Sequence, residues 1–175
     1  LNENGTMGIV LPHGVLFRGA SEGMIRKTLL EMGAIDAVIG LPANIFYGTS
    51  IPTTALILKK NRGTRDVLFI DASKDFEKQK NQNSLRNEDI RKIVDAYKKR
   101  ESIPKYTHLA EYDEIERNEF NLNIPRYVDT FEEEPQIDIV ELSNKMVDLN
   151  LQIKQKETEF LGLLDKLAIT DETRE

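Results

Sequence analysis

Short apolar runs separated by polar loops dominate the first 72 residues and predict alternating strands and helices. Between the first two runs, Ser21 precedes a helical spacing of apolar residues that ends near Gly33. The second run is apolar at nearly every position, as expected for a strand covered on both faces. We therefore expect a strand–helix–strand unit with a right-handed crossover. The four predicted strands are Met7–Leu11, Ile35–Leu41, Thr53–Leu58 and Asp66–Ile70.

The third predicted strand follows the second after a loop that is too short to hold a crossover helix. The two strands are therefore expected to pair as an antiparallel hairpin. We predict that this antiparallel strand is inserted at the end of an otherwise parallel sheet.

Residues 73–135 are more polar and predict a mixed helical and extended connector attached to the α/β part. One helix is expected to begin at Asn87, with Ile90, Ile93, Val94 and Tyr97 on one face. A second short helix is expected within Glu111–Glu119. Asn121–Val128 is predicted to be extended because Pro125 disfavours the helical region for the residue before it. Glu132–Pro135 is interpreted as a linker.

Residues 136–175 are expected to form one long amphipathic helix, from Asp138 to about Ala168 and roughly 45 Å long at 1.5 Å per residue. Apolar residues recur in alternating steps of three and four, which is typical of a heptad seam, and Lys156 interrupts them. The helix either folds back onto the α/β part or packs on a partner helix; we favour a partner. The seam residues are Ile139, Leu142, Met146, Leu149, Ile153, Phe160, Leu163 and Leu167.

The net charge of −6 conceals an asymmetry along the chain. Residues 1–65 hold seven of the 24 Lys and Arg but only four of the 30 Asp and Glu. A surface for nucleic acid is therefore expected in this first part. Its basic cluster comprises Lys59, Lys60, Arg62 and Arg65, which would contact the DNA backbone; a solvated turn after a buried strand is the alternative.

Composition excludes several classes of function. The chain has no Cys, which rules out disulfides and thiolate metal sites, and its two His residues lack a suitably spaced acidic partner, so no metal site is expected. No apolar run approaches the roughly 20 residues that a membrane helix needs. The chain does not begin like a signal peptide, and we expect it in the cytoplasm.

Two loops combine Pro, Gly and polar residues directly after apolar strands. The first is Pro12-His13-Gly14 and the second runs from Leu41 to Thr53. Open α/β sheets form their ligand crevice at the carboxyl ends of the strands, so both loops are candidates for a binding site.

These segments closely resemble the modification subunit of type I restriction-modification systems, which methylates adenine in DNA. The resemblance implies an α/β fold that is the C-terminal half of a methyltransferase Rossmann-like sheet with an antiparallel strand, a helical appendage and a long C-terminal helix. It also implies that the chain is the C-terminal part of a longer enzyme. The matching segments are 11–18, 40–48, 66–73, 121–127 and the final helix.

In that family, S-adenosylmethionine lies on a glycine-rich first loop, and an Asn-Pro-Pro-aromatic motif holds the amine of the target base. Neither motif occurs in this sequence. We therefore expect S-adenosylmethionine as the cofactor of the full-length enzyme, no bound cofactor on this chain, and no catalytic residue within it. The chain alone is predicted to be inactive.

The resemblance further implies that the chain contributes the side of the site that receives the flipped adenine. The family segment carries an aromatic residue just before a glycine, and Phe46 is preferred over Tyr47 for stacking on the base. The alternatives are that the rings belong to the core and that His13 is a hydrogen-bonded structural residue. The complete predicted pocket comprises Pro12, His13, Asn44, Phe46, Tyr47 and Gly48.

The implied partners are double-stranded DNA and the specificity and restriction subunits of the type I complex. The helical spacers of the specificity subunit are the expected partners of the C-terminal heptad seam. A homodimer through that helix is the expectation for the chain in isolation. The alternative function is a non-catalytic helical interaction or dimerisation module.

Overall fold

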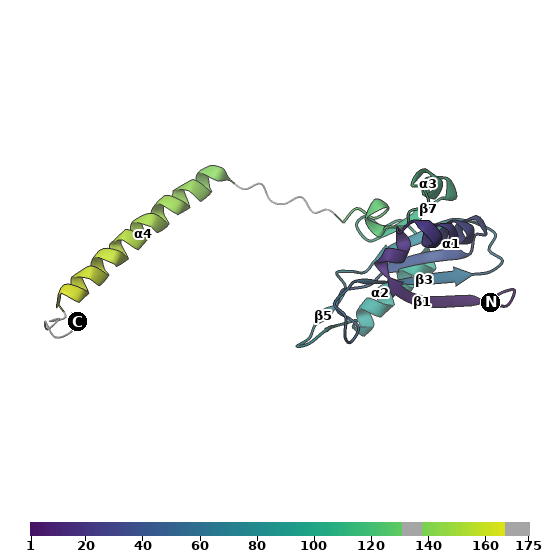
Figure 1. Cartoon of the computed structure of the whole chain (residues 1–175), viewed down its shortest axis with the longest axis horizontal. Coiled ribbons are helices and arrows are strands. Elements are labelled where there is room, and N and C mark those ends of the chain that lie inside the picture. Colours follow the sequence, from purple (N-terminus) through teal and green to yellow (C-terminus); the bar gives the residue numbers. More distant parts are fainter. Residues whose placement is uncertain (131–137, 167–175) are drawn as a thin grey trace. The chain divides into compact units, whose positions relative to one another are not determined.

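The computed structural model describes residues 1–130 and 138–166, and the chain divides into two compact units, Leu1–Phe131 and Glu132–Glu175. We call the described part of the first unit the body. The described part of the second unit is a single helix, α4 (Figure 1). Each unit is considered by itself.

A five-stranded sheet forms the centre of the body, with the strand order β1-β3-β2-β4-β7. Only β2 and β4 pair in parallel, whereas β1 with β3, β3 with β2 and β4 with β7 are antiparallel. The first four strands confirm the four predicted segments within one or two residues. The strands are β1 Thr6–Pro12, β2 Ile35–Gly40, β3 Thr53–Lys59, β4 Val67–Asp71 and β7 Thr107–Ala110.

The predicted antiparallel pairing of the second and third strands is correct, but the predicted position of the third strand is wrong. β3 lies between β2 and β1 rather than at the end of a parallel sheet. The turn after β2 is local, so β3 occupies the position beside β2, and β1 pairs with the other side of β3. β1 and β2 therefore run in the same direction with one strand between them.

Helix α1, Ala20–Glu31, shows how a polar residue can replace an expected apolar one in the core. Gly33, at φ +63°, follows the helix end as predicted. The helix begins at Ala20, and its N-cap is Gly19, two residues before the Ser21 expected there. Met24 is 67% exposed, whereas Arg26 is buried. The Arg26 guanidinium donates to the carbonyls of Phe120, Val15 and Arg18 at 2.7 to 3.0 Å, which satisfies it inside the body.

Residues 73–130 belong to the same compact unit as residues 1–72. β7 extends the sheet beyond β4, and the Tyr127 ring stacks on Phe69 at a centroid distance of 3.9 Å. Few of these residues are apolar, but several of them are buried, so a small number of contacts joins the segment to the core. Its core residues are Ala96, Ala110, Ile115, Leu122, Ile124, Tyr127 and Val128.

The helices of residues 73–130 match their predicted positions, but one extended segment does not. The helices are α2, Asn87–Lys99, and α3, Tyr112–Arg117. Ile124–Arg126, predicted to be extended, is a short 3₁₀ helix, and Pro125 is accommodated because its missing N–H is not needed in a first turn. A second 3₁₀ helix, His13–Leu16, follows β1. The two-stranded hairpin of β5, Glu77–Lys78, and β6, Asn83–Ser84, was not predicted.

Helix α4, Ile139–Lys166, confirms the predicted long helix over 28 residues. Asp138 caps it, because its Oδ1 accepts the N–H groups of Val140 and Glu141 at 2.9 and 3.2 Å. The proposed linker Glu132–Pro135 and the seam residue Leu167 lie outside the described residues. In the described ranges, no helix combines the length and the apolar character that crossing a membrane requires.

Candidate functional site

Two loops and a strand end meet at one end of the sheet, which we call the crevice end. β2 and β4 are parallel, so the loops after Gly40 and Asp71 leave the sheet on the same side. The first of these, residues 41–52, is the aromatic loop. Two backbone bonds fix its base: Leu41 N–H donates to Thr53 O at 2.9 Å and Ala72 N–H donates to Gly40 O at 3.0 Å.

The aromatic loop presents both of its rings outside the core. Phe46 is 42% exposed and Tyr47 is 90% exposed, whereas their neighbour Ile45 packs against a core cluster. Phe46 also forms an isolated β-bridge with Thr49, which fixes its backbone. Gly48 has φ +81° and open space where a side chain would begin, so this position favours glycine and leaves room beside the rings.

His13 joins the end of β1 to the start of β3. Its Nε2 lies 2.9 Å from Thr53 O, and a carbonyl oxygen only accepts, so Nε2 carries the proton. The same oxygen accepts the N–H of Leu41, which ties the crevice end together at one atom. This geometry matches the interpretation of His13 as a hydrogen-bonded structural residue. Pro12 pairs with Thr53 at the last position of the β1–β3 register.

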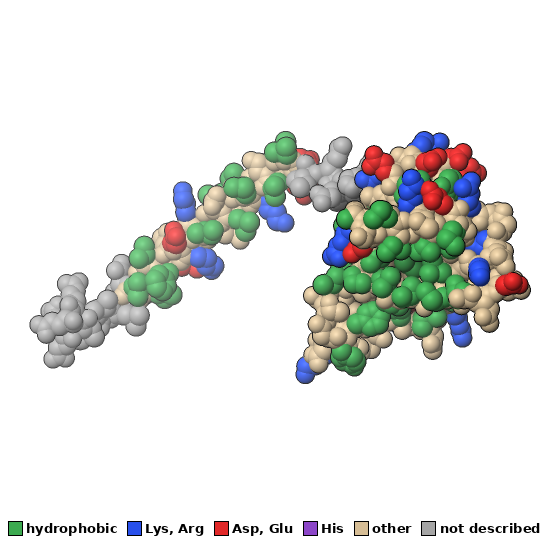
Figure 2. Space-filling model, turned by 45° about the vertical axis from the view of Figure 1, so that its right-hand side comes forward, with side chains coloured by type: hydrophobic (Ala, Val, Ile, Leu, Met, Phe, Trp, Pro, Cys, Tyr) green, Lys and Arg blue, Asp and Glu red, His purple; other side chains and the backbone are tan. Residues whose placement is uncertain are grey.

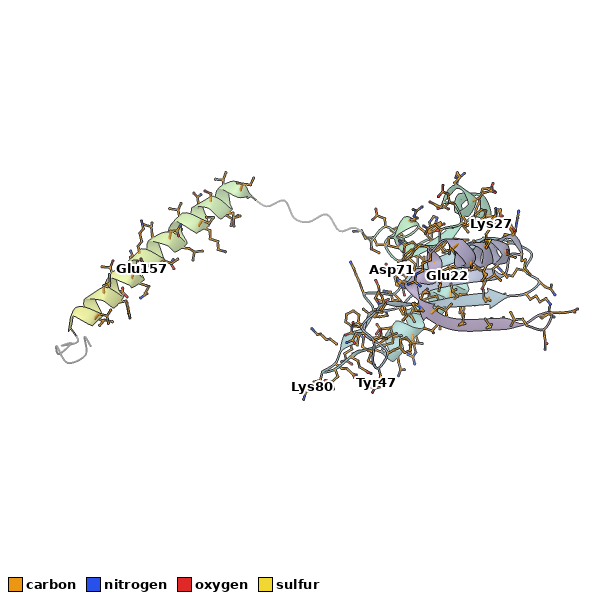
Figure 3. All side chains as sticks on the ribbon, in the orientation of Figure 1. Glu22, Lys27, Tyr47, Asp71, Lys80 and Glu157 are labelled. Atoms are coloured by element: carbon orange, nitrogen blue, oxygen red, sulfur yellow. The ribbon has the colours of Figure 1, made fainter. Side chains whose placement is uncertain are left out.

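The β5–β6 hairpin, residues 77–84, is a component of the crevice end that sequence reasoning missed. Asn83 donates from its backbone N to Asn44 O and from Nδ2 to Ala43 O, both at 2.8 Å. Asn44 Nδ2 donates in return to Asn81 O at 3.4 Å, and Asn44 itself has φ +55°. The only signal for the hairpin in the sequence is the run of amides Asn81-Gln82-Asn83. Figure 3 labels Tyr47 and Lys80 at this same end of the body.

The predicted basic cluster lies at the other end of the sheet, which we call the network end. Lys59 pairs with Thr6 at the opposite limit of the register from Pro12 and Thr53. Lys59 Nζ is 3.1 Å from Asp36 Oδ2. Arg62, whose side chain is 8% exposed, contacts Asp36 at 3.0 Å and Asp66 at 3.2 Å. The side chains of Lys59 and Arg62 therefore form ion pairs within the protein.

The other two members of the cluster have local contacts of their own. Lys60 donates its backbone N–H to Gly5 O at 3.2 Å. The Arg65 guanidinium lies over the ring of Tyr112, 3.8 Å from its centroid. The alternative interpretation of this cluster, a solvated turn after a buried strand, describes the exposed Lys60 and Arg65 but not Arg62, which is inside.

Asp36 is the centre of the network end. Burial alone would raise the pKa of Asp36, but hydrogen bonds from Tyr97 and Lys59 and the charges of Arg100 and Arg62 hold it below its ordinary value. Arg100 bridges Asp36 and Asp66 at 3.0 and 2.6 Å. Three cations thus surround one buried carboxylate, and this arrangement stabilises the junction of β2, β3 and α2.

Gly40, the last residue of β2, is packed too closely to carry a side chain, because a Cβ there would meet Ile124 Cδ1 at 2.7 Å. Its small size therefore serves packing against a side chain. Within residues 1–130 and 138–166, no three His, Cys, Asp or Glu side chains group as metal ligands.

Helix α4 exposes hydrophobic side chains along its length (Figure 2). The described seam residues are each at least 50% exposed. Lys156, in the seam, pairs with Glu159 at 2.8 Å. At about 100° per residue, Val140, Val147 and Leu151 lie on the side of the helix away from the seam, where they are also exposed. The helix is therefore apolar on two sides.

Comparison with known proteins identifies one family. The family described as N-6 DNA Methylase matches residues 1–136. The MpnII type I restriction enzyme methylase subunit of Mycoplasma pneumoniae is 37% identical over 97% of this chain and 31% of its own length. The MjaVII methylase subunit of Methanocaldococcus jannaschii is 39% identical over 89% of this chain and 27% of its own length. The chain thus spans about a third or less of these relatives.

Solved structures of the same kind of subunit share the fold. The type I methyltransferase subunit of Streptococcus thermophilus superposes with a TM-score of 0.72 and 69% identity over 73% of this chain and 27% of that one. The M protein of the EcoKI type I restriction enzyme superposes with a TM-score of 0.57 over 98% of this chain and 43% of that one. At 17% identity, that second likeness concerns the fold alone.

Proposed function

Because the chain belongs to the N-6 DNA methylase family, we propose that it forms the target-base side of the site in an adenine-N6 DNA methyltransferase. The resemblance to type I modification subunits is confirmed by the relatives. The observation that carries the proposal is the aromatic loop, which holds Phe46 and Tyr47 outside the core at the carboxyl ends of β2 and β4.

Phe46 is the proposed stacking residue. Its backbone is fixed by the bridge to Thr49, and 42% of the residue remains open to a ligand. A platform that is already in position costs less ordering on binding than one that must be ordered. Tyr47, at 90% exposure, has almost no neighbours to fix its ring and is the alternative. Adenine must leave the DNA stack to be methylated, and an aromatic face compensates part of the lost stacking.

A duplex that carries one 2-aminopurine opposite an abasic position tests this role. The fluorescence of this adenine analogue falls when it stacks, so the chain should quench it and Phe46→Ala should abolish most of that quenching. Stacking contributes about 1–3 kcal/mol per base, or roughly ten- to a hundredfold in affinity for the extrahelical base. Phe46→Tyr should restore the signal. If Phe46→Ala leaves the quenching unchanged and Tyr47→Ala abolishes it, Tyr47 is the stacking residue. If neither substitution changes the quenching, the proposed pocket is wrong.

The chain is proposed to do none of the transfer chemistry by itself. It lacks the Asn-Pro-Pro motif and the glycine-rich first loop of the family. S-adenosylmethionine would supply the methyl group in a full-length enzyme, whereas the residues described here would position the base. Calorimetric titration should show no saturable binding of S-adenosylmethionine to the chain, and micromolar binding would contradict this.

We further propose that α4 docks on the helical spacer of a specificity subunit. The support is the heptad seam, which is exposed over all of its described positions and interrupted by Lys156. A lysine in a seam lowers stability but fixes register. The alternative function, a non-catalytic dimerisation module, uses the same surface with a second copy of the chain.

Leu149→Asp combined with Ile153→Asp tests the docking surface. Each buried charge should cost several kcal/mol at a desolvated seam, so co-purification with the specificity subunit should be lost. The control is Asn144→Asp with Gln155→Asp, which adds the same charges on exposed positions away from the seam and should leave assembly intact. Normal assembly of the seam variant would reject the proposal. If light scattering shows a stable dimer of this chain that persists when the specificity subunit is added, the dimerisation alternative is favoured.

A further inference from the structure

We propose that the β5–β6 hairpin, residues 77–84, contacts the sugar-phosphate backbone of DNA beside the flipped base, through Lys78 and Lys80. This inference rests on the proposed target-base function and adds a binding element to it. The basic cluster that the sequence suggested for this task lies at the network end of the sheet. The hairpin lies at the crevice end instead.

The hairpin is fixed to the aromatic loop rather than simply near it. Asn83 makes two 2.8 Å hydrogen bonds to the backbone carbonyls of Ala43 and Asn44, which precede Phe46 by three and two residues. Its turn is closed by Gln79 N–H, which donates to Gln82 O at 2.9 Å. A ligand that reaches Phe46 or Tyr47 therefore meets the hairpin as part of the same surface (Figure 3).

The lysines of the hairpin, like several others in the body, lack a carboxylate partner among the described residues, and they are set apart by their place at the crevice end. Lys78 and Lys80 are exposed and make no ion pair in the part of the chain that the structure describes. By contrast, Lys92 binds Asp75 at 2.8 Å and Lys59 binds Asp36 at 3.1 Å. An unpaired lysine releases a counterion from DNA without first breaking an internal ion pair.

The remaining residues of the hairpin also suit an anionic ligand. From Lys78 to Ser84 the sequence is Lys-Gln-Lys-Asn-Gln-Asn-Ser, which contains no acidic residue; Glu77 precedes it. Gln79 and Asn81 are exposed at the turn, and amide side chains donate hydrogen bonds to phosphate oxygens. Asp75, the acidic residue before Glu77, already binds Lys92.

The salt dependence of DNA binding tests the proposal, because each lost phosphate contact reduces the slope of log K against log salt by about 0.9. The variant is Lys78→Gln with Lys80→Gln, measured on the 175-residue chain with the 2-aminopurine duplex. We expect the slope to fall by about 1.8. The control is Lys98→Gln with Lys99→Gln, an equal change of charge on exposed residues at the end of α2 beside Arg100 of the network end. It should leave the slope unchanged.

The two readouts separate failure of this inference from failure of the proposed function. If the hairpin variant keeps the slope of the unmodified chain while Phe46→Ala still loses quenching, the base pocket stands and the hairpin proposal is overturned. Equal losses of slope in the hairpin and control variants would also overturn it, because they would indicate a general effect of net charge. Absence of saturable duplex binding by the unmodified chain at low salt would overturn both. Circular dichroism checks that each variant is folded.

Discussion

The two ends of the sheet contain similar residues that the structure uses in opposite ways. At the network end, basic side chains close on Asp36 and Asp66, and Arg62 is taken almost completely out of water. At the crevice end, Lys78 and Lys80 are exposed without a carboxylate partner among the described residues, next to two exposed rings. The difference shows that a basic side chain is available to a ligand when the fold places no carboxylate next to it. Its place in a basic run of the sequence does not decide this.

The largest expected effect comes from removing the central charge of the network end. Asp36→Asn keeps the size of the side chain but leaves Lys59, Arg62 and Arg100 without their shared carboxylate. Breaking a buried ion pair costs about 3–5 kcal/mol, and partial exposure of Lys59 and Arg100 places the expected loss near 3 kcal/mol. Urea unfolding measures it. Asp95→Asn, on the exposed side of α2, is the control and should stay within about 0.5 kcal/mol.

A smaller effect is expected from pH, which weakens the same network without mutation. Burial would raise the pKa of Asp66, but hydrogen bonds from Thr64 and Arg100 and the nearby guanidinium charges hold the pKa below its ordinary value, as for Asp36. Both carboxylates therefore favour the folded state above the unfolded pKa of about 3.9, and this stability is lost as pH falls through the lower folded values.

Unfolding free energies measured from pH 7 downward should accordingly stay level and then fall at acidic pH. In Asp36→Asn, the decrease of the unfolding free energy at acidic pH should be smaller. A remainder is expected because Asp89, paired with Arg86, also has a lowered pKa. An identical acid profile in the variant and the unmodified chain would show that Asp36 is not the group that titrates.

The crevice end should respond more weakly to the loss of its anchor. Asn83→Ala removes the Nδ2 hydrogen bond to Ala43 O and should cost about 1 kcal/mol. Quenching of the 2-aminopurine duplex should weaken as well, because the aromatic loop loses a fixed support. Asn81→Ala is the control, since Asn81 contacts Asn44 through its backbone oxygen only. Equal effects of both variants would contradict a specific role for Asn83.

The smallest expected change in stability comes from Phe46. Because its ring belongs to neither core cluster, Phe46→Ala should alter the unfolding free energy by about 0.5 kcal/mol or less while it reduces base binding. The comparison is Phe69→Ala, which removes a fully buried ring stacked on Tyr127 and should cost about 3–5 kcal/mol. A loss of unfolding free energy of that size in Phe46→Ala would indicate that the ring is part of the core.

Local pattern predicted the strands of the sheet because apolar runs and the turns between them are short-range features. Met7–Leu11, Ile35–Leu41 and Thr53–Leu58 each fall on a strand. The order of the strands needed a long-range pairing, that of β1 with the far side of β3, which no run of residues encodes by itself. The same holds for β7, whose four residues pair with β4 across a gap of more than 30 residues.

The position of the aromatic loop followed from a family motif, whereas charge alone did not predict the ion pairs of the basic cluster. The aromatic loop was located from its Phe-Tyr-Gly sequence, and the structure places it at the carboxyl end of β2. The basic cluster was chosen from the frequency of Lys and Arg, which says nothing about Asp36, 23 residues before Lys59 in the sequence. Asn83 was overlooked because an amide in a polar stretch has no periodic signal, and its role depends on which carbonyls lie beside it.

The two apolar sides of α4 restrict the stoichiometry of any complex that the helix joins. One partner helix packed on the Leu149 seam would leave Val140, Val147 and Leu151 in water. If partner helices alone cover the two sides, the smallest such assembly contains three helices. A pair of α4 copies alone would therefore retain an outward apolar strip on each copy, which makes such a pair prone to recruit further helices.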